Sequence, residues 1–141
     1  MNIDSIQNGI VIDHITSGKG MKLYELLKLD ELDCSIAIIK NVTSKKMGKK
    51  DIIKIDADIP VNIDVIGYID PGATVNIIKD GIRAEKMNIR MPAILTNVIK
   101  CKNPRCITTT EQELDHVFKL TDKENKVYRC VYCETKEERI I

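Results

Sequence analysis

Aromatic residues are scarce in this sequence, which has no tryptophan, one phenylalanine and four tyrosines. Proteins that bind single-stranded nucleic acid stack bases on aromatic side chains, so this scarcity argues against such a platform. Charge of one sign does not dominate either, because 22 lysine and arginine residues face 21 aspartate and glutamate residues. A near-neutral chain lacks the excess positive charge with which proteins bind the phosphate backbone of nucleic acids. We therefore expect no nucleic-acid partner.

Long hydrophobic runs are also missing, since no apolar stretch approaches the ~18 residues that cross a bilayer. The opening MNIDSIQNGIVIDHI lacks the basic segment and following apolar segment of a secretory signal. We therefore expect a cytoplasmic protein with no membrane partner, in a compartment that keeps thiols reduced. An apolar fraction of 43% within 141 residues supports one ordinary domain or two small ones.

Four of the five cysteines stand in two close pairs, CKNPRC at 101–106 and CVYC at 130–133. The pattern C-x4-C, 23 residues, C-x2-C lets two tight turns bring four sulfurs to one ion. Zn²⁺ takes four thiolates in a tetrahedron with Zn–S bonds of about 2.3 Å, which leaves no position for a catalytic water. Asn103 and Pro104 favour a turn, and turn N–H groups can donate to thiolates. The sequence predicts one structural zinc ion per chain, with the ligands Cys101, Cys106, Cys130 and Cys133.

Other uses of the cysteines fit less well. Two disulfides need an oxidising compartment, and a redox CxxC pair is expected at a helix N-terminus rather than at 130–133. His116 is an alternative ligand, but a surface or half-buried histidine is the simpler interpretation, and Cys34 is expected to be a buried core thiol. The negative charge of a four-thiolate zinc site requires compensation, for which nearby basic residues are available: Lys100, Lys102, Arg105 and Arg129.

The C-terminal segment is predicted to be a small β domain. Short stretches rich in β-branched or aromatic residues (ITTT, HVFKL and KVYRCVY) alternate with the turn-prone TDKEN. A domain of about 45 residues cannot fold on its core alone, so zinc supplies the missing stability. We place this all-β domain at 93–141, and expect the apolar segment 90–100 to pack it against the preceding domain.

The first part of the chain, 1–92, predicts the order β-α-β-β-α-β with one added strand. This is the ferredoxin-like α+β arrangement, an antiparallel sheet with two helices on one face. Ser17 is the expected N-cap of the first helix, and Pro71 ends the second. The strands are expected at 9–15, 34–42, 50–56, 74–80 and 82–89, and the helices within 17–30 and 61–70.

Polar residues interrupt these strands. Asp13 and His14 follow an apolar run, Lys50 and Lys54 share one face of a strand, and Asn76 lies within TVNII. A charge within a sheet is costly unless it is exposed or meets a ligand. Solvated edge-strand charges and a phosphate-bearing ligand both remain open on this pattern. GxGxxG and Walker-type phosphate loops are absent, and SGKG is too short a fragment to count.

Together, VIDHI (11–15), MGKKDIIKI (47–55), TVNII (74–78) and the cysteine array resemble the regulatory chain of aspartate carbamoyltransferase. The resemblance runs nearly end to end. It implies a non-catalytic allosteric subunit of pyrimidine biosynthesis, whose first domain binds the nucleotide effectors CTP and ATP. It also implies a zinc domain that docks on the catalytic chain, and a heterododecamer in which regulatory dimers, paired through their N-terminal domains, join catalytic trimers.

The same resemblance implies an effector site, with Asn103 near the catalytic-chain interface. Gly81 stands where some relatives carry a tyrosine beside the nucleotide, and the N-terminus and the region around the second helix are shorter than in the best-known relatives. Rival functions are a zinc-ribbon nucleic-acid adaptor and a redox enzyme using Cys130 and Cys133. The implied effector-binding residues are Ile6, Val11, Asp13, His14, Lys50, Lys54, Asn76, Ile78 and Lys86.

Overall fold

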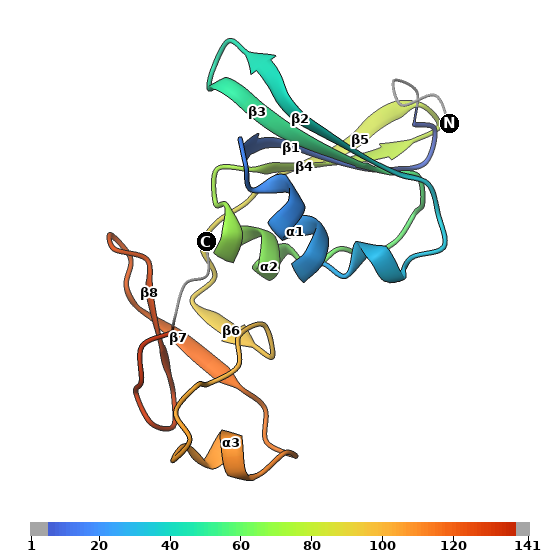
Figure 1. Cartoon of the computed structure of the whole chain (residues 1–141). Helices are drawn as coiled ribbons and strands as arrows, with labels where there is room; N and C mark the ends of the chain where they lie inside the picture. The colour runs from blue at the N-terminus through green and yellow to red at the C-terminus, as the bar shows by residue number, and fades with distance from the viewer. Residues whose placement is uncertain (1–5, 138–141) are drawn as a thin grey trace. The chain divides into compact units, whose positions relative to one another are not determined.

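The computed structural model describes residues 6–137 of the chain (Figure 1). The chain divides into two compact units, 1–91 and 92–141. No helix within the described residues is long and apolar enough to cross a membrane.

The first unit is a five-stranded antiparallel sheet with strand order β2-β3-β1-β4-β5. Both of its helices lie on one face of this sheet (Figure 1). The order β4-β1-β3-β2 is that of the ferredoxin-like arrangement, and β5 is added beside β4. The fold class predicted from the sequence is therefore confirmed. The elements are β1 (Gly9–Thr16), α1 (Gly20–Leu26), β2 (Ile36–Ser44), β3 (Gly48–Ile55), α2 (Ile63–Ile69), β4 (Thr74–Lys79) and β5 (Ile82–Asn88).

The core of this unit lies between the sheet and the helices. Strand residues alternate between faces, so every second residue of β1 and β3 points toward the helices. Ile12, Ile53 and Ile55 have no solvent exposure, and neither does Leu23 of α1. Burying an aliphatic side chain of this size stabilises a fold by roughly 1.5–3 kcal/mol. The opposite face of the sheet carries the lysines and is described below.

A buried carboxylate positions the start of α1. Asp51 of β3 has no solvent exposure and accepts hydrogen bonds from the backbone N–H groups of Gly18, Gly20 and Asn41, at 3.0, 3.1 and 3.0 Å. It thereby satisfies N–H groups at the helix start that would otherwise lack acceptors. The predicted N-cap, Ser17, was wrong, because its hydroxyl instead contacts the Asn41 side chain and Asp51 takes over the capping role.

The second helix is capped as its sequence suggests. The side-chain oxygen of Asn62 accepts from the N–H groups of Asp64 and Val65 at 3.1 and 3.4 Å. Pro71 lies one residue beyond the C-cap Asp70, where proline commonly follows a helix. The expectation for Cys34 was wrong, because this thiol is only half-buried in the turn before the outer strand β2.

The second unit is a three-stranded antiparallel sheet of order β6-β7-β8. Its core contains Leu95, Phe118 and Tyr128, each at most 1% exposed. The segment ITTT was expected to be a strand and is instead the one-turn helix α3. Its threonine hydroxyls donate to backbone carbonyls of the preceding turn, as with Thr109 to Cys106 O at 2.6 Å. The elements are β6 (Ile94–Thr96), α3 (Ile107–Thr110), β7 (Val117–Asp122) and β8 (Val127–Cys130).

Candidate functional site

The second unit gathers its four cysteine sulfurs within 4.8 Å of one another. Cys101 Sγ lies 3.5 Å from Cys133 Sγ, and Cys106 Sγ lies 3.7 Å from Cys130 Sγ. A tetrahedron with Zn–S bonds of about 2.3 Å has sulfur–sulfur edges of about 3.8 Å. These separations fit a metal ion at the centre and are too long for disulfides, whose S–S bonds are about 2.05 Å. All five thiols of the chain are free.

Backbone N–H groups of the two turns point at the sulfurs. The N–H of Asn103 donates to Cys101, and those of Tyr132 and Cys133 donate to Cys130. In the first turn, Cys106 N donates to Asn103 O at 3.1 Å, which closes the loop around the metal position. The turn chemistry expected from the sequence is thus present, with donors aimed at groups that carry negative charge when a metal binds.

Two threonines supply hydroxyl contacts. Thr108 Oγ1 lies 3.0 Å from Cys106 Sγ, and Thr135 Oγ1 lies 3.2 Å from Cys133 Sγ. Sequence reasoning assigned charge compensation to basic residues and missed these hydroxyls. The signal was present in the sequence, because the second cysteine of each pair is followed by x-Thr, as CIT and CET. One of the basic residues, Arg129, donates instead to the carbonyl of Glu134 at 3.1 Å.

The thiol pKa values reflect crowding in this pocket. Burial, with further contributions from Cys133, Cys106 and Cys130, raises the pKa of Cys101 to about 12 despite donation from the Asn103 N–H. Burial likewise raises the pKa of Cys130. Burial also opposes ionisation of Cys133, but hydrogen bonds with Thr135 and Asn103 outweigh it and lower the pKa of this thiol to about 6.

His116 is half-buried, as expected, and is not aimed at the sulfur cluster as a ligand. Its Nδ1 accepts a hydrogen bond from the backbone N–H of Cys101 at 3.1 Å. The ligand set for the metal is thus four cysteine sulfurs, with backbone N–H donors and two threonine hydroxyls in contact with them. Such a set is typical of structural zinc sites, in which no coordination position is left open.

In the first unit, predicted effector residues share the sheet face that lies away from the helices. In an antiparallel pair, directly opposed residues project to the same side. Lys54 is opposite Val11, Val11 is opposite Asn76, and Asn76 is opposite Lys86. One row of side chains therefore crosses four strands. Ala37 of β2, opposite Lys54, extends the row to the fifth strand and was not anticipated.

A β-bulge brings a carboxylate next to a lysine on this face. The pairing of β1 with β3 shifts between Ile12 and Ile15, and His14 has a positive φ of 57°. Asp13 Oδ1 lies 2.9 Å from Lys50 Nζ. Burial raises the pKa of Asp13, but the hydrogen bonds from Lys50 and the His14 N–H prevail, so the pKa lies below its ordinary value. The bulge therefore places a positioned ion pair beside the row.

The remaining predicted residues surround this face. His14 Nδ1 lies 3.0 Å from Thr74 Oγ1, and Ile78 pairs with Gly9 at the start of β1. Ile6 is 8% exposed, and its Cγ2 lies near the point where a side chain on Gly9 would begin. Gly81, with φ of 77°, forms the turn between β4 and β5, and its N–H donates to Gln7 O at 2.9 Å.

Comparison with known proteins gives a consistent result along the chain. Residues 1–90 match the allosteric domain, and residues 93–141 the metal-binding domain, of the aspartate carbamoyltransferase regulatory chain. The regulatory chain of Clostridium tetani is 50% identical over 135 residues, covering 95% of this chain and 94% of the relative. That of Clostridium botulinum strain Hall is 48% identical over 134 residues, covering 95% and 92%.

A more distant regulatory chain, from Bifidobacterium longum, is 42% identical over 134 residues, covering 95% of this chain and 96% of the relative. Both units are therefore matched, and the four clustered cysteines lie in the metal-binding domain. With an allosteric domain followed by a metal-binding domain, this chain belongs to the family of aspartate carbamoyltransferase regulatory chains, which are regulatory rather than catalytic subunits.

Proposed function

We propose that this chain senses nucleotides on the open face of its first domain, 1–92, and transmits their binding through a zinc domain, 93–141, to a catalytic chain. The observation that carries the proposal is the row of side chains across the sheet, from Lys54 through Val11 and Asn76 to Lys86. This sheet face combines lysines, an amide and aliphatic side chains. These groups can contact the phosphates, the base edge and the apolar parts of a nucleotide.

The row offers groups for each part of CTP or ATP. Lys50, Lys54 and Lys86 supply positive charge to the phosphates, which lysine binds as a mobile point charge. Asn76 can donate and accept at a base edge, and its Nδ2 already lies 3.4 Å from Val11 O. Asp13 can accept from a ribose hydroxyl. Ile6, Ile78 and His14 border this surface, with aliphatic contact from the two isoleucines.

The ion in the second domain is zinc in this proposal, bound by Cys101, Cys106, Cys130 and Cys133. Four thiolates in a closed tetrahedral set are typical of structural zinc. When bound, the ion crosslinks the turns at 101–106 and 130–133 and supplies folding free energy rather than chemistry. Residues of the chain orient the sulfurs, chiefly through the N–H donors and the two threonines.

The partner proposed for this domain is the catalytic chain of aspartate carbamoyltransferase. Large apolar side chains are exposed around the metal turns: Ile107 at 49%, Val131 at 44% and Tyr132 at 50%. Exposed apolar groups beside polar turns, Asn103 among them, are typical of an interaction surface. In the proposed dodecamer, regulatory dimers pair through the first domain, whose outer strands β2 and β5 can each extend a sheet into a second copy.

Regulation requires that the nucleotide bind the two states of the complex unequally. Coupling free energies of this kind are typically ~1–3 kcal/mol, and the effect on binding is reciprocal. We propose that nucleotide binding on the sheet shifts the conformational equilibrium of the first domain. Residues 90–100 then transmit this shift to the zinc domain.

Calorimetry on the complex reconstituted with its catalytic chain tests the sensing role. We expect CTP and ATP to bind, and Lys54→Met to weaken binding about tenfold or more, as expected for the loss of about 1.5–3 kcal/mol from a charged hydrogen bond. The control is Lys22→Met in α1, on the helix side of the sheet. No nucleotide binding by the wild-type complex would remove the proposal.

The same preparation tests the rival functions. Salt-sensitive binding of RNA or DNA at low micromolar levels would favour a nucleic-acid adaptor. Titratable free thiols at Cys130 and Cys133 in the metal-loaded protein would favour a redox enzyme. We expect neither, because the aromatic content is low and all four clustered sulfurs are committed to the metal.

A further inference from the structure

Two short segments on one side of the metal cluster are joined by reciprocal hydrogen bonds between Asn97 and His116. Asn97 N donates to His116 O at 2.7 Å, and His116 N donates to Asn97 Oδ1 at 2.9 Å. Asn97 Nδ2 also donates to Asp115 Oδ1 at 2.9 Å. Asn97 has a positive φ of 58°, which asparagine tolerates better than most residues. This arrangement, called here the Asn97–His116 clasp, fixes the backbone of His116.

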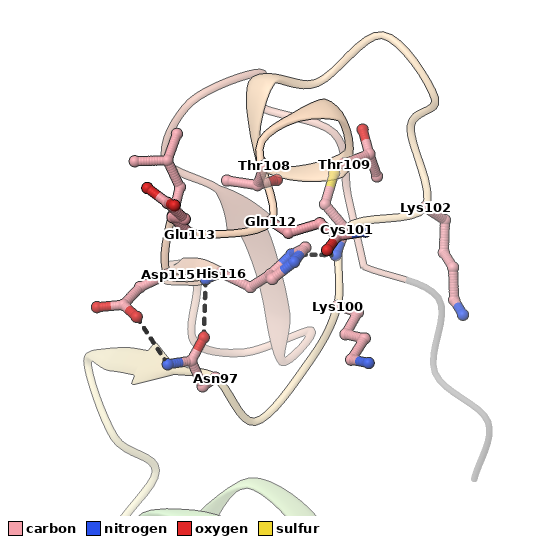
Figure 2. Close-up of a pocket in the computed structure, with 11 residues that line it drawn as sticks. Asn97, Lys100, Cys101, Lys102, Thr108, Thr109, Gln112, Glu113, Asp115 and His116 are labelled. Atoms are coloured by element: carbon pink, nitrogen blue, oxygen red, sulfur yellow. Dashed lines mark hydrogen bonds between the residues drawn. The ribbon is translucent and has the colours of Figure 1, made fainter.

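The clasp directs the imidazole of His116 at the first metal ligand. The backbone N–H of Cys101 lies 3.1 Å from His116 Nδ1 (Figure 2). A backbone N–H can only donate, so Nδ1 is the acceptor and the ring proton is on Nε2. The tautomer is therefore set by Cys101, although His116 is 15 residues away along the chain.

We propose that His116 is a positioning residue of the metal centre, whose imidazole holds the backbone of Cys101 so that its sulfur faces the metal. Cys101 needs such a contact more than its partners do. Cys130 and Cys133 share one short turn with several hydrogen bonds to their sulfurs, and Cys106 is the N-cap residue of α3. Cys101 follows residues 97–100, which belong to no helix or strand, so the clasp supplies an anchor on that side.

The surroundings make the side chain of His116 a suitable target for substitution. The ring forms part of the wall of a hollow of about 570 Å³, lined also by Lys100, Thr108 and Gln112. Cys101 also lines this hollow, and Figure 2 shows the ring of His116 directed at the backbone of Cys101. A residue of different shape can therefore replace it without crowding the apolar core at Phe118 and Tyr128.

Two variants separate an acceptor role from simple packing. His116→Phe keeps a ring of similar size but removes the acceptor. His116→Asn loses the ring but keeps an oxygen near the position of Nδ1. We expect His116→Phe to release zinc to a chromogenic chelator about tenfold faster than wild type, because loss of a hydrogen-bond partner of a metal ligand typically lowers metal affinity about tenfold or more. His116→Asn should stay close to wild type.

The cobalt(II)-substituted full chain gives a second readout that packing alone does not move. We expect the d–d bands of His116→Phe to shift because Cys101 is misplaced, and those of His116→Asn to match wild type. Zinc release and spectra of His116→Phe that equal wild type would overturn the proposal. Equal damage in both variants would also overturn it, because the ring's bulk would then be what matters.

A third variant covers the case in which His116→Phe does not fold. Asn97→Gly allows the positive φ and keeps the backbone hydrogen bond to His116 O, but removes the side-chain half of the clasp. We expect zinc release to accelerate, though less than in His116→Phe, and an unchanged rate would overturn the proposal. The inference rests on the proposed zinc site, and different results would refute each of them. Wild-type protein without bound metal would refute the zinc assignment, whereas the variants above test the role of His116.

Discussion

Asp51 shows how one buried side chain can hold three segments of a domain together. Its carboxylate accepts from Gly18, Gly20 and Asn41, which lie at the start of α1 and on β2. Removing it leaves three backbone donors without acceptors in a site closed to water. Unsatisfied buried groups cost about 1–3 kcal/mol each, although neighbouring losses are not fully additive.

We predict that Asp51→Ala lowers the free energy of unfolding of the first unit by about 3–5 kcal/mol. Urea denaturation of the zinc-loaded chain measures this, and hydrogen exchange at Gly18, Gly20 and Asn41 reports it locally. Asp56→Ala is the matched control, because Asp56 is exposed just beyond β3 and its loss should change stability by less than about 0.5 kcal/mol. Equal effects of the two substitutions would contradict the role given to Asp51.

The Asp13–Lys50 pair makes a pH-dependent contribution. The pKa of Asp13 is lowered in the folded chain relative to its ordinary value of 3.8, so the folded state binds this proton less readily than the unfolded state. The resulting stabilisation is present above about pH 4 and is lost as pH falls through the lowered pKa. We predict that Lys50→Met moves the carboxyl titration of Asp13 upward when it is followed by NMR. An unchanged midpoint would mean that the Lys50 contact does not act on Asp13 in solution.

At the scale of elements, the two turns of the second unit depend on the ion they share. The sheet β6-β7-β8 buries few large side chains, so its core alone supplies little stability. We predict that a strong chelator unfolds residues 92–141 while the first unit retains its structure. Two-dimensional NMR with residue-resolved signals checks this, with readdition of zinc as the control. A second unit that stays folded without metal would contradict the prediction.

The order of elements in the first unit was predictable because its strands are short runs rich in β-branched residues, separated by turn signals and by two segments with helical apolar spacing. The cysteine cluster was predictable because ligand spacing in short turns is nearly fixed by geometry. Capping of α1 was not, since Asp51 lies 31 residues from Gly20 and sequence windows report only local partners. The ITTT segment has β-branched residues typical of strands, yet its hydroxyls bond locally after Cys106 and favour a helical turn.

The register across the sheet also lay beyond sequence reasoning. Residues such as Lys54, Asn76 and Lys86 were assigned to effector binding through resemblance, but nothing in a single sequence states that they stand opposite one another. A shift of one position in β1 would move Val11 to the helix side. The bulge after Ile12 is a further detail of pairing, and it is what brings Asp13 to Lys50.

At the scale of the whole molecule, the proposed docking surface and the metal centre occupy the same turns. Val131 and Tyr132 lie between the ligands Cys130 and Cys133, with exposures of 44% and 50%. The metal therefore has two effects on assembly in this proposal, since it folds the domain and fixes the direction of these two side chains. A substitution that leaves the metal in place while trimming the surface separates the two effects.

We predict that Tyr132→Ser retains one zinc per chain but weakens association with catalytic trimers, because truncation of an interface aromatic commonly costs about 2 kcal/mol or more, which is roughly thirtyfold in affinity. Cys106→Ser should lose both metal and association. Size-exclusion chromatography with light scattering and metal analysis distinguishes the variants, and Thr121→Ser on β7 serves as a surface control. Assembly of Tyr132→Ser at wild-type affinity would mean that the catalytic chain binds another surface. Assembly of metal-free Cys106→Ser would mean that docking does not depend on the zinc-bound turns.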